Sequence, residues 1–473
     1  MHLVLFATKS CGLLAFLPIV LGNACPRTIV RDVVVIGGGA SGAYAAVRLR
    51  DDLNETVVLV EKEEILGGHV DSYTDPETAQ SYNYGVQTFV ETPNARAFFA
   101  RHGIDVAPPT RLTNITTQYV DFTTGQEVPF VPPSANASNA AMKKYKEVAE
   151  KYEHLMVPGF FNWPSPQDIP EDLLMPFRDF VDKYQILDAV PTIWRVTGVG
   201  SGDISDLLTM HVMQAFGAPM ARALLLEQEQ LVVASGRNQD LYDAVARNLG
   251  DDVLLSTTVI TGQRTNNGVV LLTENHKTGE LTKIKAKKLL VAMAPTEQNL
   301  KSLDLDDKER DPISKLTRNA NWAGILESSR LPVNGTLYNV PASGASGDYL
   351  DLPKSPFTAR FDYFGQDKYF RIMVITDAAM TSEETQALVQ KEFDNMVEKG
   401  VVNGPEELKY VAWSHHDALS WGMSREDILD GYYQKLYSIQ GHRSTYWTGA
   451  AFATPFQTHL WEFDEQLLPM IVG

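Results

Sequence analysis

Three glycines and one glutamate near the start of the chain have the types and spacing of a dinucleotide-binding site. The apolar run Arg31–Ile36 leads into Gly37, Gly39 and Gly42, which fit the pattern G-x-G-x-x-G, and a helical pattern follows. Glu61 ends a second apolar run, 19 residues after Gly42. An acid about 20 residues beyond the last glycine binds the ribose in such sites, so the sequence predicts one here.

Each residue of the turn has a physical role in that interpretation. Gly37 allows the tight turn, Gly39 lets the backbone approach a pyrophosphate, and Gly42 lets helix and strand pack closely. Ala40 and Ser41 stand at the helix N-terminus, where free N–H groups and the positive end of the dipole suit phosphates. The alternative is a glycine turn in an ordinary α/β protein.

Length and charge narrow the class of protein. A chain of 473 residues exceeds the size at which one core keeps growing, so we expect two domains. The net charge of −18 argues against nucleic acid as a partner. No group of His, Cys, Asp and Glu residues has metal-ligand spacing, and we expect no metal.

The first 24 residues have the pattern of a secretory signal peptide. Lys9 precedes a short apolar core, Leu13–Leu21, and small residues follow it. No later segment has the ~20 apolar residues of a membrane span, so none is expected after signal removal. Four Asn-x-Ser/Thr sequons agree with a secreted or secretory-pathway protein, and an uncleaved N-terminal anchor is the alternative. The sequons begin at Asn54, Asn114, Asn136 and Asn334.

The rest of the chain alternates between helical and mixed patterns. Helices are expected in several stretches between residues 140 and 233, the last of them over Met220–Val233. An α/β pattern returns at Gly236, with a buried-type strand at Leu289–Pro295. Residues 300–360 read as irregular, followed by two paired strands up to Thr376 and a helix over Glu383–Lys399.

Taken together, these segments resemble the flavin-containing amine oxidoreductase superfamily. Gly37–Gly42 with Glu61 resembles its FAD fingerprint, and Gly67-Gly68 its second glycine motif. Three later segments resemble the return to the FAD domain, the strand ending beside the flavin, and the closing motif with its helix. They are Gly236–Leu241 with Val253–Val259, Leu290–Pro295, and Tyr446–His459.

The resemblance implies a mixed α/β and α+β fold with a Rossmann-like FAD-binding domain built from discontinuous segments. That domain would comprise residues 28–95, 225–300 and 435–473, and a mixed substrate domain residues 96–224 and 301–434. The cofactor-binding residues implied are Gly37, Gly39, Ala40, Ser41, Gly42, Glu61, Lys62, Gly67, Gly68, His69, Val259, Gly449 and Thr458.

Within the superfamily, the sequences of Arg31–Leu49 and Leu66–Tyr73 are most similar to those of the β-cyclopiazonate dehydrogenase family. Its type member is a secreted-type fungal flavoenzyme that oxidatively closes a ring in an indole tetramic acid. Two positions depart from the amine oxidase pattern. His69 replaces an arginine after the glycine pair and is a candidate point of covalent flavin attachment, and Ala451 replaces an acid near the end.

The resemblance implies that the cofactor supplies the reactivity and the protein supplies position and exclusion of water. Candidate catalytic residues are the polar and aromatic groups expected to face the flavin, foremost His459, Trp447 and His415, with Phe456, Trp413 and His416 beside them. A buried histidine with a satisfied hydrogen bond, or a core tryptophan, is the structural alternative for each.

Only one dinucleotide fingerprint is present, because Gly198–Gly202 lacks a preceding strand and a following acid. We therefore expect no NAD(P)H domain, reduction of the flavin by a small-molecule substrate, and reoxidation by O2 or another acceptor. The leading hypothesis is oxidation of an amine, indole or related secondary metabolite. The alternatives are a desaturase or isomerase of a lipid-like substrate and a catalytically degenerate flavin-binding protein.

Overall fold

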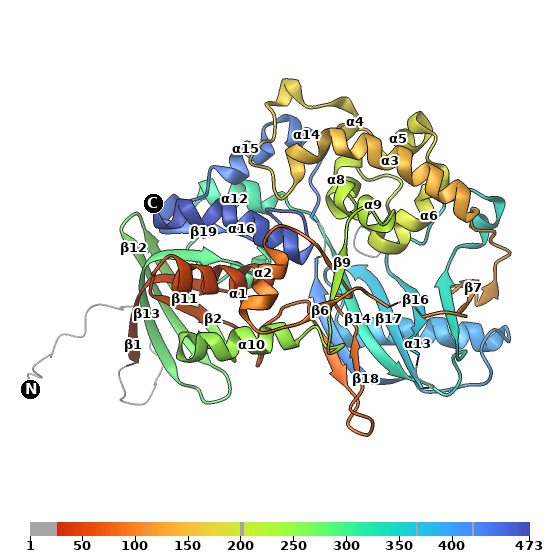
Figure 1. Cartoon of the computed structure of the whole chain (residues 1–473), viewed down its shortest axis with the longest axis horizontal. Coiled ribbons are helices and arrows are strands. Elements are labelled where there is room, and N and C mark those ends of the chain that lie inside the picture. Colours follow the sequence, from red (N-terminus) through yellow and green to blue (C-terminus); the bar gives the residue numbers. More distant parts are fainter. Residues whose placement is uncertain (1–25, 111, 199–202, 366–367, 419–420) are drawn as a thin grey trace, which may run out of the picture.

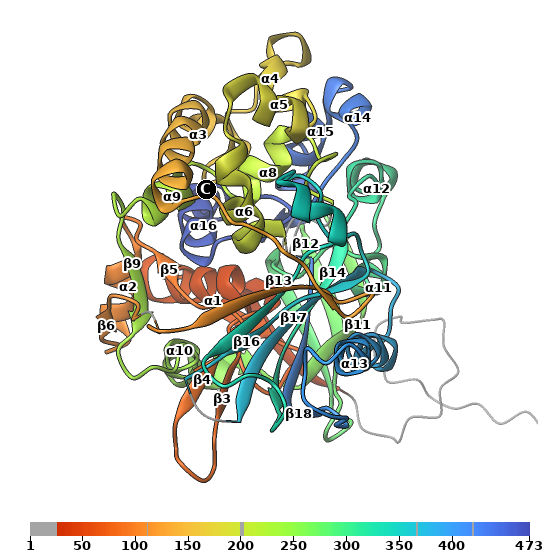
Figure 2. The same cartoon turned by 90° about the vertical axis from the view of Figure 1, so that its right-hand side faces the viewer.

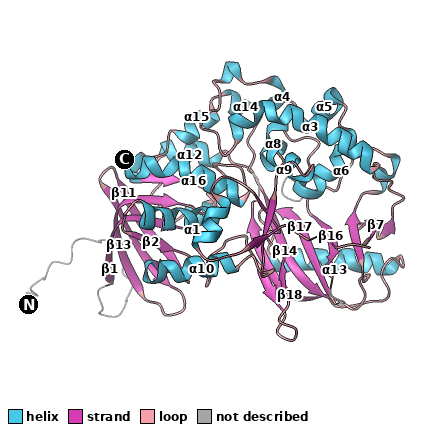
Figure 3. Cartoon of the chain, viewed as in Figure 1, coloured by secondary structure: helices cyan, strands magenta, loops and turns pink. Residues whose placement is uncertain are grey.

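The computed structural model describes residues 26–110, 112–198, 203–365, 368–418 and 421–473. Two β-sheets lie side by side, and helices cover the top of the molecule (Figure 1). Figure 2 shows the second sheet from its end, below the helical layer, and Figure 3 separates strands from helices by colour. The predicted signal peptide, residues 1–24, lies outside the described residues.

The first sheet combines a parallel core with an antiparallel meander. Its order is β10-β2-β1-β13-β12-β11, and β19 pairs with the end of β13 beyond β12. β1, β2, β10, β19 and β13 run parallel, whereas β11, β12 and β13 form the meander. The strands are β1 (Arg27–Ile36), β2 (Val57–Val60), β10 (Val253–Leu254), β11 (Thr257–Thr265), β12 (Gly268–Asn275), β13 (Leu281–Val291) and β19 (Thr445–Trp447).

The parallel strands are apolar on both faces because helices cover them. All residues of β2 and the last four of β1 are buried. Helix α1 (Ala40–Val47) continues as a short π-helical turn and packs against α16 (Gln457–Val472) and α10 (Asp240–Leu249). Helices α1 and α16, far apart in the sequence, therefore lie side by side in one layer against the first sheet (Figure 1).

The second sheet has the order β18-β14-β17-β16-β15-β7-β8 and is antiparallel except between β15 and β7. Helix α13 (Ser382–Glu398) packs Val389, Phe393 and Met396 against one face, which we call the outer face, and the opposite side is the inner face. The strands are β7 (Thr116–Asp121), β8 (Gln126–Glu127), β14 (Asn319–Glu327), β15 (Gly335–Asn339), β16 (Phe357–Tyr363), β17 (Tyr369–Asp377) and β18 (Lys409–Asp417).

The helical layer and two small sheets complete the described structure. The helices are α2 (Ala95–Arg101), α3 (Ala135–Met156), α4 (Glu171–Leu174), α5 (Phe177–Tyr184), α6 (Val190–Ile193), α8 (Thr209–Ala215), α9 (Ala218–Leu224), α11 (Glu297–Leu300), α12 (Asp307–Ser314), α14 (Arg425–Leu429) and α15 (Tyr432–Tyr437). The small sheets pair β3 (Ser72–Thr74) with β4 (Ser81–Asn83), and β9 (Gln230–Val233) with β5 (Phe89–Val90) and β6 (Val106–Ala107).

The helix expected over Met220–Val233 is wrong in its second half. Helix α9 ends at Leu224, and residues 230–233 form strand β9. Leu231 and Val233 are buried, whereas Gln230 and Val232 are less so, which is the alternation of a strand. Val232 and Leu231 pair with two other short strands, and this tertiary pairing overrides the helical pattern.

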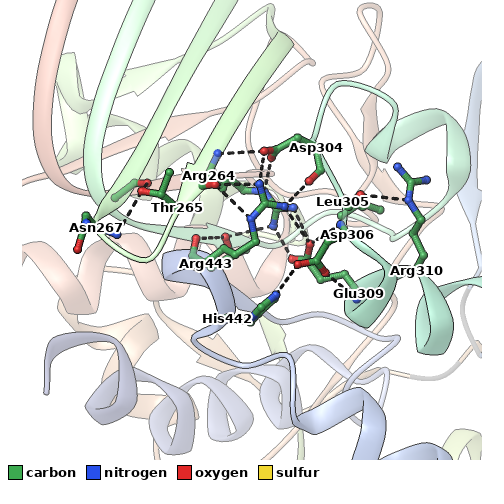
Figure 4. Close-up of polar contacts among 12 residues, drawn as sticks. Arg264, Thr265, Asn267, Asp304, Leu305, Asp306, Glu309, Arg310, His442 and Arg443 are labelled. Carbon is green, nitrogen blue, oxygen red and sulfur yellow. Dashed lines mark hydrogen bonds and ion pairs between the residues drawn. The ribbon is translucent and has the colours of Figure 1, made fainter.

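A buried ion network joins the meander to the segment that leads into β19 (Figure 4). Arg264 of β11 and Glu309 of α12 are fully buried and form two hydrogen bonds of 2.6 and 2.8 Å. Arg264 also donates to Asp304 at 3.0 Å and to Thr445, the first residue of β19, at 3.2 Å. The guanidinium of Arg443 donates in turn to the carbonyl of Arg264. This network fixes where the C-terminal segment enters the sheet.

The described residues contain neither a membrane-spanning helix nor a metal-binding cluster. No described helix combines the length and hydropathy that crossing a bilayer requires. Within the same residues, no group of three or more His, Cys, Asp and Glu side chains is arranged to hold a metal ion. The four sequon asparagines are all exposed, and glycosylation there stays a prediction.

Candidate cofactor and active site

The glycine turn after β1 leaves no space for side chains at two positions. Gly37 has φ +102°, and a Cβ there would lie 2.8 Å from the carbonyl oxygen of Ala292, just after β13. A Cβ on Gly42 would lie 1.9 Å from the carbonyl oxygen of Gly37. Strands β1 and β13 and helix α1 therefore meet at this turn with backbone contacts only.

The second glycine pair packs directly against the first motif. Gly67 donates its N–H to the carbonyl of Gly38 at 2.9 Å. Gly68 has φ +58°, and a Cβ there would lie 2.9 Å from the Cα of Gly39. Bare backbone from both motifs thus lies at the N-terminus of α1, where no side chain caps the helix. An extended phosphate-bearing group requires this kind of cradle.

Buried polar atoms without partners surround this cradle. Ser41 Oγ in the first turn of α1 has no hydrogen-bond partner among the described residues, and neither does Gln239 Oε1. Gln239 is fully buried and donates from Nε2 to the carbonyl of Leu66 at 2.6 Å, which places its side chain against Gly67. Buried polar groups normally have a partner, so these atoms fit a polar cofactor.

Glu61 occupies the position predicted for the ribose-binding acid. Its side chain is buried and accepts hydrogen bonds from the N–H groups of Gly38 at 2.5 Å and Glu63 at 2.8 Å. Lys62 points outward, with its ammonium 3.7 Å from Glu63. The N–H of Thr257 bonds to the carbonyl of Glu61, and Val259 lies two residues further along β11, at a β-bulge.

The C-terminal segment reaches the same edge of the sheet. Thr448 donates its N–H to the carbonyl of Val291 at 3.0 Å, and Gly449 follows with φ +101°. At the start of α16, Gln457 Oε1 and Thr458 Oγ1 are buried without described partners. Gly449 and Thr458, both predicted cofactor residues, thus stand near the carboxyl ends of β13 and β19, the edge at which such sheets bind ligands.

We call the first sheet, together with the helices and the glycine-motif loops packed on it, the cofactor domain. A histidine pair lies where the cofactor domain meets the second sheet. The rings of His69 and His416 are stacked, with centroids 4.7 Å apart and planes at 13°. His416 Nε2 lies 2.5 Å from Asp71 Oδ2. The ring of His69 is partly exposed and has no hydrogen-bond partner among the described residues. Desolvation by the surrounding protein and the adjacent His416 lower the pKa of His69 well below its ordinary value.

Strand β18 places His416, rather than the predicted catalytic residue His415, at this interface. A β-bulge at His416 lies between the pairs Trp322–His415 and Asn321–Asp417, and it directs His416 toward Asp71. His415 is exposed, and its ring contacts Trp322, whose side chain packs in the outer-face core. Sequence alone could not locate the bulge, because the alternation of a regular strand fits either histidine.

The other two predicted catalytic residues lie apart from the histidine pair. Trp447 is fully buried in β19 and stacks on Phe452, and its Nε1 has no hydrogen-bond partner among the described residues. His459 is 4% exposed, and burial lowers its pKa to about 4. It lines a cavity of about 410 Å³ between α16, α9 and α3, together with Glu153 and Arg222 and with none of the glycines of the two motifs.

Comparison with known proteins agrees with this geometry. Residues 35–102 match the model of the NAD(P)-binding Rossmann-like domain. The chain is 32% identical over 465 residues to a β-cyclopiazonate dehydrogenase from Aspergillus flavus, covering 97% of each chain. The chain belongs to the β-cyclopiazonate dehydrogenase family of fungal FAD-dependent oxidoreductases. An FAD-dependent oxidoreductase from Colletotrichum higginsianum is 34% identical over 448 residues, with 92% of this chain and 91% of that one covered.

Solved structures show the same fold at low identity. A fatty acid isomerase from P. acnes superimposes with a TM-score of 0.72 at 18% identity, covering 93% of this chain and 98% of that one. Cyclohexylamine oxidase from Brevibacterium oxydans gives a TM-score of 0.59 at 15% identity, over 93% and 98% of the two chains. The predicted fold class and the cofactor are confirmed: the protein is an FAD-dependent oxidoreductase with an amine oxidase-like fold.

Proposed function

We propose that this oxidoreductase dehydrogenates an amine- or indole-containing secondary metabolite. The observation that carries the proposal is the meeting of the backbone cradle at Gly39 and Gly68 with the inner face of the second sheet, through His69 and His416. The name of the relative from A. flavus supports oxidation of such a metabolite. The substrate would enter from the second sheet and lie against the cofactor.

The residues of the chain suit removal of hydrogen from a substrate held away from water. When bound, FAD accepts the two electrons of a C–H bond as a hydride, and O2 or another diffusible acceptor takes them up afterwards. The substrate then loses one proton, and His416 can accept it on the ring nitrogen that does not contact Asp71. Ring closure would follow where a nucleophile in the substrate attacks the oxidised carbon.

The test is a spectrum followed by turnover. The purified full-length protein should show the visible absorption of flavin, which an amine or indole substrate should bleach without oxygen, and oxygen should restore it with formation of peroxide. A colourless protein that cannot be reconstituted with FAD would contradict the proposal. Product formation without oxygen uptake or any other acceptor would indicate an isomerase of a lipid-like substrate instead.

Acid precipitation addresses the mode of attachment. The free ring of His69 directly follows the glycine pair, which supports the hypothesis that it is a covalent attachment point. If it is, flavin absorption stays with the precipitate and moves to the supernatant in His69→Ala. A yellow supernatant from the unaltered protein would rule out attachment.

We also propose that the protein enters the secretory pathway. The pattern of residues 1–24 and the exposure of the four sequon asparagines support this. Expression in a fungal host should give a protein whose N-terminus lies near residue 25 and whose mass falls on treatment with an N-glycosidase. Retention of Met1 in unglycosylated protein would contradict it.

A further inference from the structure

Two arginines lie side by side on the inner face of the second sheet. In register across the strands, Tyr338, Arg360 and Met373 form one row, and Asp362 and Arg371 lie opposite each other in the next. These residues alternate with the outer-face core residues, so their side chains point away from α13. Two guanidinium groups and one carboxylate therefore gather on the face that meets the cofactor domain.

The charges of this cluster do not balance. Arg371 Nη2 lies 2.6 Å, and Arg360 Nε 2.9 Å, from the same oxygen, Asp362 Oδ2. The three side chains are only 11 to 17% exposed. Burial and repulsion from Arg360 lower the pKa of Arg371. One carboxylate for two largely buried guanidinium groups leaves an excess positive charge, which is costly away from water.

The hydrogen bonds of Arg360 are also incomplete. Its Nη1 donates to the carbonyl of Arg195 at 3.1 Å, and its Nη2 to Met373 Sδ at 3.1 Å, although a thioether is a weak acceptor. Its Nε is buried and has no hydrogen-bond partner among the described residues, because the N–H does not point at the nearby Asp362 oxygen. A guanidinium presents a rigid fork of donors that suits the two oxygens of a carboxylate. A second anion would complete this arrangement.

We propose that Arg360 and Arg371 bind a carboxylate of the substrate and thereby set which metabolites the enzyme accepts. This inference rests on the proposed function. The row that contains Arg360 continues through Met373 and Ala323 to Ser414, whose hydroxyl is 3.0 Å from Tyr84 of the cofactor domain. Three strand spacings separate Arg360 from Ser414, or roughly 14 Å. A substrate that reaches from Arg360 to the edge of the sheet at Ser414 would span about that distance.

Calorimetric titration of the FAD-loaded protein tests the proposal. The probes are ω-(indol-3-yl)alkanoic acids of increasing chain length, each with its uncharged carboxamide. The unaltered protein should bind each acid about tenfold more tightly than its amide, because charge-assisted hydrogen bonds are stronger than neutral ones. Affinity of the acids should rise with chain length until the indole reaches the cofactor.

The variant Arg360→Gln/Asp362→Asn/Arg371→Gln removes all three charges without leaving Asp362 unpaired. It should keep the flavin spectrum and lose the preference for acid over amide. Lys391→Gln, which removes one positive charge from the exposed side of α13, should keep the preference. The proposal is overturned if the unaltered protein binds acid and amide equally, binds neither saturably at millimolar concentration, or if the triple variant retains the preference.

Binding and turnover separate this inference from the proposed function. Calorimetry reports the acid–amide difference whether or not any probe is oxidised. A preference for acids in a protein that turns over no amine or indole would contradict the proposed function and leave the arginine site standing. Turnover of such substrates without a preference for acids would support the proposed function and contradict the arginine site.

Discussion

The imidazole of His69 lies parallel to that of His416, and Asp71 holds His416 from the other side through a 2.5 Å contact. His69 belongs to the cofactor domain and His416 to the second sheet, so the stack joins the two parts of the molecule at the predicted active site. Besides the proton-holding role proposed above for His416, Asp71 and His416 therefore also position the ring of His69.

Asp71→Asn should therefore disturb the flavin without unfolding the protein. The hydrogen bond to His416 becomes neutral, which costs about 1 kcal/mol and loosens the stack under His69. We expect a shifted visible flavin spectrum and a changed dependence of flavin reduction on pH. His154→Asn, at an exposed position late in α3, is the control. An unchanged spectrum and pH profile would show that Asp71 and His416 do not influence the cofactor.

Gly39→Ala should weaken cofactor binding without destabilising the FAD-free protein. A Cβ at Gly39 meets only the Cα of Gly68, at 3.6 Å, so the protein without FAD should fold normally. The added methyl group would occupy the space a pyrophosphate needs, and the dissociation constant of FAD should rise about 100-fold. Gly42→Ala should instead lower the melting temperature of the FAD-free protein, because its Cβ would lie 1.9 Å from Gly37 O. Equal effects of both variants on stability would contradict this distinction.

Glu61→Gln tests the predicted ribose contact. The amide keeps the size of the side chain but loses the charge that accepts two N–H groups and would accept the ribose hydroxyls. FAD affinity should fall about tenfold, measured by quenching of flavin fluorescence during reconstitution. Glu63→Gln serves as the control, since the side chain of Glu63 is 66% exposed. Equal FAD affinities of the two variants would show that Glu61 does not bind the cofactor.

Arg264→Met should be strongly destabilising. It leaves Glu309 buried without its partner, and we expect a loss of about 3–5 kcal/mol in the free energy of unfolding, read from denaturant titration. The double variant Arg264→Met/Glu309→Leu should recover much of the loss, because an apolar pair has no charge to desolvate. If the double variant is no more stable than the single one, the other partners in Figure 4 matter more than Glu309.

The free energy of unfolding of the part formed by the second sheet and α13 should depend on the ionisation of Glu392. This residue of α13 is buried, and burial raises the pKa of its carboxyl from 4.5 to about 7. The folded state thus keeps a proton that the unfolded chain releases, so stability is highest below about pH 4.5 and declines up to about pH 7. Glu392→Gln should not show this decline, and its advantage should grow by about 3 kcal/mol across that window. Thermal unfolding at several pH values measures this, with Glu398→Gln at an exposed position as control.

The glycine motifs were predictable because their positions are fixed by backbone sterics. Gly37 and Gly42 have no room for a Cβ, and that requirement is local in sequence. By contrast, β14 and β15 lie within residues 300–360, which read as irregular, because they acquire their order from pairing with β17, β18 and β7. The cluster of Arg360, Asp362 and Arg371 could not be predicted for the same reason, because these residues become neighbours only through the register of β16 and β17.

Strand β19 (Thr445–Trp447) and helix α16 (Gln457–Val472) follow the rest of the first sheet in the chain by more than 150 residues, yet β19 lies beside β13 and α16 packs on α1. A nascent chain therefore cannot enclose its cofactor until residues 445–472 have been synthesised. Such long-range closure makes folding slow, and it ensures that a truncated product, which would expose a reactive redox ring to solvent, does not assemble the complete pocket.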